Sequence, residues 1–409
     1  DLLARQPPVD GAKQRIGWTI IGQSQFDQGV YDEAEKAYAN ALAQTAPTAA
    51  EYADITERLA ASVYRQGEAK RKAGDDAGAA DDFLRVARAA PGSKIVATSQ
   101  YDAAAALINT KQWDRAIQVL EAYRRDYPKG EFAADVTRKL AVAYVEAGRG
   151  ELAAAEFERI AATPGEDPAV VREALGKAAD LYDKAGNATR TVALLEQLVQ
   201  KYPTPVTDAM ELRWRLAESA RKAGNTQRLA YWRNEIIRAD ASAGPGRTDR
   251  TRYLAAHARL AQVEPLRDSY RAIKLGAPLK TSLVRKRKAL DEALAGYKDV
   301  ASYNVADTTT AANYEIAELY RTLARDLMAS ERPKKLSAEE RDQYDSLLEE
   351  QAFPIEEQAI SLHEVNAVRT VDGIYDESVQ RSFKALAELK PARYGKSELS
   401  VADITNAPV

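Results

Sequence analysis

The sequence predicts an all-α protein built as an elongated stack of antiparallel helix pairs, and three observations carry this prediction. Its 409 residues are rich in Ala and 29% charged, with only 21 Gly and 16 Pro, a composition that favours helix. Ala116, Ala153 and Thr191 hold equivalent places in three similar stretches, 37 and then 38 residues apart. Each stretch carries two apolar stripes at helical spacing, which is typical of a helical repeat array.

The composition also narrows the classes of function. The net charge of −3 provides no basic face for nucleic acid. Cysteine is absent, so the chain has no disulfide, no thiol nucleophile and no cysteine-based zinc site. No apolar run approaches the roughly 20 residues that a transmembrane helix needs. We therefore expect a protein without nucleic-acid partners or a membrane-spanning segment.

The first repeat is the clearest in the chain. Residues 1–14 are expected to form a loose leader, and an array of about six helix pairs is expected over 15–240. In the first pair, Trp18 begins the apolar pattern, Gly29 suits a left-handed turn between the helices, and Pro47 ends the second helix. The second pair has a longer first helix, predicted at 49–73. The repeat pattern decays in the sixth pair, as terminal repeats do.

Beyond the array, Gly-Pro-Gly within residues 241–248 predicts a linker. Residues 249–394 are expected to form degenerate helical repeats or a cap, and 395–409 a flexible tail. Pro265 predicts a kink or a break in its helix, and Ser337 with Glu340 predicts a capping box. The helix candidates of this part are Tyr253–Leu275, Ser282–Tyr297, Thr309–Ser330, Ala338–Gln351, Pro354–Val371 and Tyr375–Leu389.

Motifs for catalysis or metal binding are incomplete. His363-Glu364 begins like the zinc motif H-E-x-x-H, but Ala367 stands where the second ligand would be. We therefore interpret His363 as an exposed or capping histidine. Gly395-Lys396-Ser397 resembles the end of a phosphate loop without its first glycine or its strand, and is interpreted as a polar tail. The sequence predicts no catalytic residues, no metal and no cofactor.

The pattern from Trp18 to Pro47 resembles the tetratricopeptide repeat family, with W-x2-L-G-like spacing at Trp18-x-x-Ile21-Gly22 and small and aromatic positions after it. The period, with Trp113-Asp114-Arg115-Ala116 and the stretch 127–133, is similar to periplasmic members from outer-membrane assembly and Tol–Pal systems. Residues 300–394 resemble, more diffusely, the C-terminal parts of envelope proteins linked to gliding or TonB-type systems. The resemblance implies a right-handed superhelical solenoid that acts as a non-catalytic scaffold.

The same resemblance implies a partner-binding groove lined by fixed positions of the first helix of each pair. Trp214, flanked by Arg215 and Arg221, is the most anchor-like cluster, because Trp and Arg are favoured in binding hot spots. The alternative is that Trp214 packs against the next helix. The selected positions are Arg138, Val142, Glu146, Lys177, Asp180, Lys184, Trp214, Arg215, Glu218 and Arg221.

From these features we expect a protein-binding scaffold of the bacterial cell envelope, with components of an envelope complex as partners. The resemblance implies a periplasmic location, with association to the outer membrane as a further expectation. Two alternatives stay open: a structural spacer or oligomerising component, and the helical region of an enzyme. The oligomeric state is left open by the sequence.

Overall fold

The computed structural model describes residues 10–396, and over this range it contains helices and no strand. Eighteen α-helices and two short 3-10 helices make up the described part of the chain. The all-α prediction is confirmed. The chain divides into two compact units, residues 1–194 and 195–409, and the division falls inside one helix, α10.

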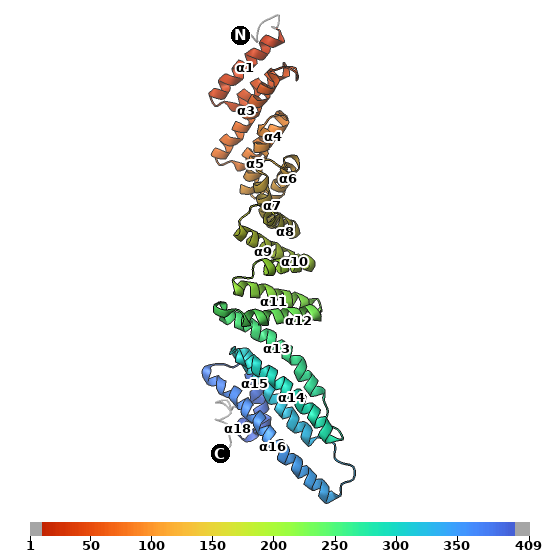
Figure 1. Ribbon diagram of the computed structural model, residues 1–409. Coiled ribbons are helices and arrows are strands. Elements are labelled where there is room, and N and C mark those ends of the chain that lie inside the picture. The colour runs from red at the N-terminus through yellow and green to blue at the C-terminus, as the bar shows by residue number, and fades with distance from the viewer. Residues whose placement is uncertain (1–9, 397–409) are drawn as a thin grey trace, which may run out of the picture. The chain divides into compact units, whose positions relative to one another are not determined.

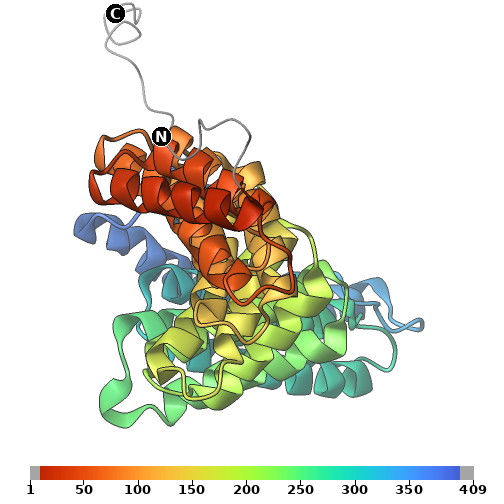
Figure 2. The ribbon, with the colours of Figure 1, turned by 90° about the horizontal axis from the view of Figure 1, so that it is seen from above.

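In unit 1 (residues 1–194), each helix from α1 to α8 packs against the next one along the chain. First and second helices of successive pairs alternate, with α3, α5 and α7 on one side and α4, α6 and α8 on the other (Figure 1). The pairing of α1 with α2 is also visible from above in Figure 2. The helices are α1 (Gly11–Asp27), α2 (Tyr31–Ala43), α3 (Tyr52–Lys72), α4 (Asp76–Ala89), α5 (Ile95–Asn109), α6 (Trp113–Asp126), α7 (Ala133–Glu146), α8 (Gly150–Ala161), α9 (Pro168–Lys184) and α10 (Ala188–Lys201).

Glycines fix both the turn and the spacing of these pairs. Gly29 lies between α1 and α2 with φ +78°, the left-handed conformation predicted for it. Gly22 and Gly67 lie inside first helices against rings of the second helices. A Cβ on Gly22 would lie 2.9 Å from the ring of Tyr38, and one on Gly67 would lie 2.7 Å from the ring of Phe83. These two glycines therefore set how closely the paired helices approach.

Polar contacts also recur along unit 1 at the repeat spacing. Arg115 Nη2 lies 2.6 Å from Asp81 Oδ1, and Arg149 Nη2 lies 2.6 Å from Asp114 Oδ1. Both pairs join the start of one second helix to the second helix of the preceding pair. All four side chains are substantially exposed, so each pair contributes at most about 1 kcal/mol. The buried apolar stripes, not these ion pairs, hold the stack together.

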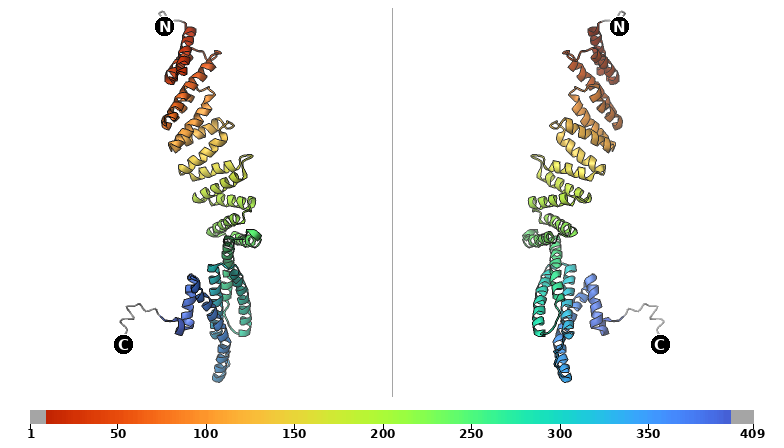
Figure 3. Two further views of the ribbon diagram at one scale, coloured as in Figure 1. Left: turned by 90° about the vertical axis from the view of Figure 1, so that its left-hand side faces the viewer. Right: turned by 90° about the vertical axis from the view of Figure 1, so that its right-hand side faces the viewer.

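Unit 2 (residues 195–409) combines a helix pair with much longer helices. In both side views of Figure 3, α14 and α15 run side by side, and their contact agrees with this. The short helix α17 packs on both α15 and α16. The elements after α10 are α11 (Val206–Lys222), α12 (Thr226–Ala241), η1 (Gly244–Gly246), α13 (Asp249–Ala272), α14 (Leu279–Ser302), α15 (Ala306–Met328), α16 (Ala338–Val368), η2 (Arg369–Asp372), α17 (Glu377–Leu389) and α18 (Pro391–Tyr394).

A buried lysine lies in the core of the long helices. Lys286 on α14 is fully buried, and its Nζ lies 2.7 Å from Asp326 Oδ2 of α15. The same ammonium donates to the backbone oxygen of Ile273 at 2.7 Å and lies 4.5 Å from the ring centre of Tyr270. A buried charge is tolerated only when it is paired and hydrogen-bonded, and Lys286 meets both conditions. The contact ties α13, α14 and α15 together.

Two prolines lie inside helices where the sequence favoured breaks. The predicted helices Ala338–Gln351 and Pro354–Val371 are one helix, α16, which continues through Pro354. The separate helix start at Pro354 was therefore wrong, although the capping box at Ser337 and Glu340 is present. An interior proline costs about 3 kcal/mol or more. Ala352 and Ile360 are buried on the two sides of Pro354, so packing of both halves offsets that cost.

Helix α13 also continues through its proline. Pro265 is an interior residue of this helix, so the chain does not split there. Val263 and Tyr270, on the two sides of Pro265, are fully buried in the core of unit 2. Burial on both sides therefore keeps the segment helical.

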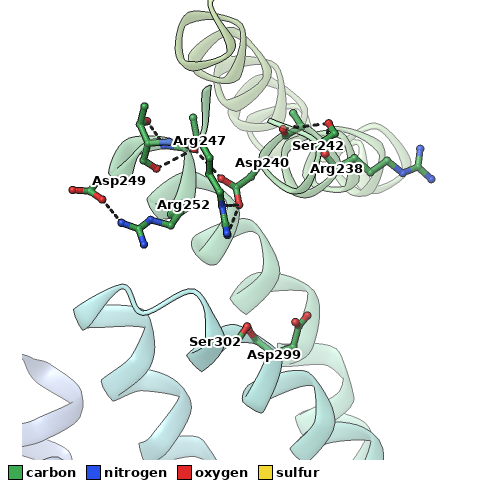
Figure 4. A network of polar contacts seen from close by, with 11 residues as sticks. Arg238, Asp240, Ser242, Arg247, Asp249, Arg252, Asp299 and Ser302 are labelled. Atoms are coloured by element: carbon green, nitrogen blue, oxygen red, sulfur yellow. Dashed lines mark hydrogen bonds and ion pairs between the residues drawn. The ribbon is translucent and has the colours of Figure 1, made fainter. Parts of the chain in front are cut away.

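The junction between α12 and α13 is held by a buried carboxylate, Asp240, which is 1% exposed. Its oxygens accept hydrogen bonds from Arg247 Nε at 2.9 Å and Thr251 Oγ1 at 2.8 Å (Figure 4). Thr248 and Thr251 form a reciprocal capping box at the start of α13. The segment predicted as a linker, 241–248, thus holds η1 and the N-cap of α13.

The expected ends of the chain are only partly described. Residues 1–9 of the predicted leader and 397–409 of the predicted tail lie outside the described residues, while α1 begins at Gly11. The tail motif at Gly395-Lys396-Ser397 is cut by the same boundary. Among the helices of residues 10–396, none combines the length and apolarity that crossing a membrane requires.

Candidate functional site

The predicted groove residues of α7 form one exposed stripe. Arg138, Val142 and Glu146 are spaced four residues apart, so they lie on one face of the helix, and all three are exposed. The other face carries Leu140 and Tyr144, which are buried in the core of unit 1. The structure therefore presents an apolar side chain to solvent with a cation one turn before it and an anion one turn after it.

The stripe on α7 is partly ordered by its neighbours. Arg138 Nη2 lies 2.7 Å from Glu166 Oε2, in the connection between α8 and α9. Val142 is 48% exposed, and the nearby Val145 is 41% exposed. Exposed valines add apolar area that a partner could cover, at roughly 25 cal/mol per Å².

The candidates on α9 form a second exposed stripe within unit 1. Lys177, Asp180 and Lys184 are all exposed, at spacings of three and four residues. Lys177 Nζ lies 2.7 Å from Glu173 Oε1 on the preceding turn and 5.7 Å from the ring centre of Phe157. Lys177 is thus paired with a carboxylate of its own helix, and its ammonium also contacts a ring of α8.

The candidates on α11, in unit 2, are more buried than those on α7 and α9. Trp214, Arg215 and Glu218 are half-buried, and only Arg221 is exposed. Glu218 Oε2 accepts a hydrogen bond of 2.8 Å from Arg221 Nη2. Trp214 is therefore partly exposed and partly packed in unit 2. This intermediate burial lies between the two interpretations from the sequence, a binding anchor and a residue packed against the next helix.

Two arginines beside this cluster were missed by the sequence reasoning. Burial lowers the pKa of Arg213, against the charge of Glu235, and burial also lowers the pKa of Arg233, against the charges of two glutamates. The Nε of Arg213 is buried without a hydrogen-bond partner. Neither residue falls on the groove positions of a repeat, and the sequence carries no other signal for them. These half-buried guanidinium groups add donors to this part of α11 and α12.

The histidine of the incomplete zinc motif lies in the core of unit 2. His363 is 0% exposed, so the interpretation as an exposed or capping residue was wrong. The helix α16 turns this side chain toward α15 and α17, where Nδ1 lies 3.3 Å from Ser382 Oγ and Nε2 lies 3.3 Å from Glu318 Oε1. Within residues 10–396, no group of three or more potential ligands could hold a metal ion.

The order Ser382, His363, Glu318 is that of a hydrolytic triad, but its burial argues for a structural role. Ser382 is 0% exposed and also accepts a hydrogen bond of 3.1 Å from Asn366 Nδ2. A nucleophile must reach the substrate, and this hydroxyl is enclosed by α15, α16 and α17. The cluster joins the three helices through hydrogen bonds of His363, Asn366 and Ser382, although His363 Nε2 and Asn366 Oδ1 have no hydrogen-bond partner.

Glu318 is the charged member of this cluster. Burial raises the pKa of its carboxyl, but hydrogen bonding by His363 and the charge of Arg321 outweigh that effect, so the pKa lies below its ordinary value. Glu318 is therefore a carboxylate that stabilises the folded state when it is ionised.

Two segments of the chain match the model of a known protein family. Residues 98–130 and 173–205 match the family model described as the tetratricopeptide repeat. The first match covers most of α5 and α6, and the second runs through α9 and α10. The repeat type predicted from the spacing is thus confirmed for these segments. No curated protein matches the chain.

Solved structures with a similar arrangement include two bacterial proteins. A tetratricopeptide repeat protein from Parabacteroides merdae is 14% identical over 76% of this chain and 98% of its own, with a TM-score of 0.26. The PilF protein of Pseudomonas aeruginosa is 16% identical over 56% of this chain and 92% of its own, with a TM-score of 0.24. At these scores neither structure indicates a function for the chain.

Proposed function

We propose, from the tetratricopeptide repeats at residues 98–130 and 173–205, that the chain is a non-catalytic scaffold which binds a segment of a partner protein. Repeat arrays of this kind bury each helix pair against its neighbours and leave the groove positions of the first helices free for binding. The described residues hold no cluster of metal ligands, and the one arrangement with a triad-like order is enclosed in the core.

One observation carries the proposal, the exposed valine at the centre of the α7 stripe. Val142 lies between Arg138 and Glu146, and every sequence-selected candidate on α7 and α9 is exposed. Apolar side chains at binding surfaces contribute most when charged neighbours surround them and exclude water. The stripe fits a partner segment with one apolar side chain and with charges opposite to those of Arg138 and Glu146.

The test is site-specific photo-crosslinking in cells of the source organism. A photoreactive residue replaces Val142, and the matched control replaces Leu152 on α8, a second helix of unit 1, where the side chain is also 48% exposed. We expect protein adducts at Val142 that are absent at Leu152, and loss of the partner from the complex when Val142→Glu is introduced. Equal adducts at both positions would refute the assignment of binding to the first helices.

The same experiment separates the scaffold from a structural spacer. Adducts between two copies of this chain at Val142, without any other protein, would indicate an oligomerising component and would overturn the scaffold proposal. Circular dichroism of Val142→Glu provides the folding control, because an exposed substitution changes stability by about 0.5 kcal/mol or less.

We further propose that the scaffold works in the bacterial cell envelope, with components of an envelope complex as partners. The support is the resemblance of the repeat period and of residues 113–116 to periplasmic members of the repeat family. Fractionation of cells that produce the tagged protein tests this location. Recovery in the cytoplasmic fraction, with a periplasmic marker correctly released, would refute it.

A further inference from the structure

Unit 2 contains a cleft that the repeat positions do not account for. It has a volume of about 640 Å³ and lies among the C-terminal end of α13, the connection that follows it, α15 and α17. Clefts that hold ligands fall in the range of about 300–1,000 Å³. The charged side chains that line it include Arg271, Lys274, Arg325 and Arg381.

The carboxylates of the cleft already have cationic partners. Asp326 lies 2.7 Å from the buried ammonium of Lys286, and Glu318 lies 3.3 Å from His363 Nε2. Lys274 and Arg381, in contrast, have no ion pair with any carboxylate in the described part of the chain. The cleft therefore holds cations in excess of the acids that could neutralise them.

Two of the arginines are held in place before any ligand arrives. The guanidinium carbon of Arg381 lies over the ring of Tyr314, 4.2 Å from its centre, in a cation–π contact. Arg271 Nη2 lies 3.0 Å from Glu315 Oε2. Because these side chains are pre-oriented, a ligand loses less rotamer entropy when it binds them. A guanidinium on a ring still has its N–H edges free for a carboxylate.

The chemistry of the lining indicates the class of ligand. Pockets for small molecules are mostly apolar with few polar groups, whereas charged side chains dominate this cleft. We propose that the cleft binds an acidic segment of a partner protein, with Lys274 and Arg381 as its principal anchors and Arg271 and Arg325 at its sides. This interaction is separate from the α7 and α9 stripes, because it uses other residues of the chain.

The test uses the full chain and a fluorescein-labelled oligoglutamate peptide as the probe, followed by fluorescence anisotropy at low and moderate salt. The cleft variant is Lys274→Glu/Arg381→Glu. The matched control is Arg285→Glu/Arg287→Glu, which makes the same change in net charge at exposed positions of α14 outside the cleft. We expect the cleft variant to weaken peptide binding at least about tenfold, and the control to weaken it less than about twofold.

Each outcome decides the proposal. Equal loss of peptide binding in both variants would mean that the peptide is attracted by net charge alone, and would overturn the proposal. Absence of peptide binding to the native chain would also overturn it. Displacement of the peptide by inorganic phosphate at equal concentration would overturn it in favour of a small-anion site. The single variant Lys274→Gln, at an exposed residue without an ion pair, reports on the cleft if the double variant folds poorly. Unchanged binding in Lys274→Gln would then refute its anchoring role.

Discussion

The close approach of α3 and α4 allows a quantitative test of how the repeats are spaced. In Gly67→Ala, the added Cβ would lie 2.7 Å from ring atoms of Phe83, a side chain that is fully buried. Real Cβ atoms do not come this close, so the ring or the helix must shift. Overpacking of a well-filled core costs about 1–3 kcal/mol. Alanine also gains about 1 kcal/mol over glycine inside a helix, which partly hides the clash.

A second glycine removes this ambiguity. Gly176 lies inside α9 in the same unit, and a Cβ there would meet no other atom within 4 Å. Gly176→Ala therefore gains the helix propensity alone. The propensity contribution cancels between the two variants, so Gly67→Ala should be about 1–3 kcal/mol less stable than Gly176→Ala, which itself should exceed the native chain by up to about 1 kcal/mol.

The assay is urea denaturation followed by circular dichroism, together with hydrogen exchange of peptides from α3 and α4. Hydrogen exchange is needed because repeat arrays can unfold locally, a few repeats at a time, and not as one cooperative unit. We expect faster exchange in α3 and α4 for Gly67→Ala and no change there for Gly176→Ala. If Gly67→Ala is as stable as Gly176→Ala, the glycine does not set the spacing of the pair, and the reasoning fails.

Three further predictions concern unit 2. Lys286→Ala removes the donor to the backbone oxygen of Ile273 and the buried partner of Asp326, and should destabilise the unit by about 1–3 kcal/mol in urea denaturation, against about 0.5 kcal/mol or less for the exposed Lys288→Ala. Asp240→Ala removes buried hydrogen bonds at the start of α13 and should cost about 1–3 kcal/mol, more than Asp249→Ala at an exposed carboxylate. Because the pKa of Glu318 is depressed in the folded state, its contribution is complete above the ordinary value of 4.5 and is lost as the pH falls through the lower folded value.

These predictions can each be contradicted by a simple result. Equal unfolding midpoints for Lys286→Ala and Lys288→Ala would mean that the buried ammonium contributes nothing. A larger loss in Asp249→Ala than in Asp240→Ala would assign the junction to the exposed residue. Glu318→Gln should flatten part of the acid dependence of stability, and an unchanged profile would show that other carboxylates cause it.

Much of the fold was predictable because repeat packing is local in sequence. Gly29 and the capping box at Ser337 and Glu340 act through their own backbone neighbours, so their residue types were sufficient. The separate helix start at Pro354 was wrong, and the helix does not split at Pro265, where a kink or a break was expected, for the opposite reason. A proline disfavours helix locally, but buried side chains on both sides of each proline outweigh that cost through contacts with distant helices.

For the candidate site, too, some features could be predicted from the sequence and others could not. The stripe positions of α7 and α9 could be chosen from the sequence, because the resemblance to the repeat family implies fixed positions on the first helix of each pair, and these positions lie opposite the buried residues. The burial of His363, and the surplus of cations around Arg381, could not be chosen. They depend on which helices of unit 2 meet.

By itself, the sequence determined that the chain forms paired helices, where its repeats recur and which positions of α7 and α9 face solvent. These properties follow from backbone periodicity and from the size of side chains a few residues apart. Only the tertiary structure decided that Lys286 is buried beside Asp326, that Asp240 fixes the start of α13, and that a cationic cleft lies among α13, α15 and α17. The physical reason is that burial and charge pairing depend on residues far apart in sequence, whose meeting no local pattern encodes.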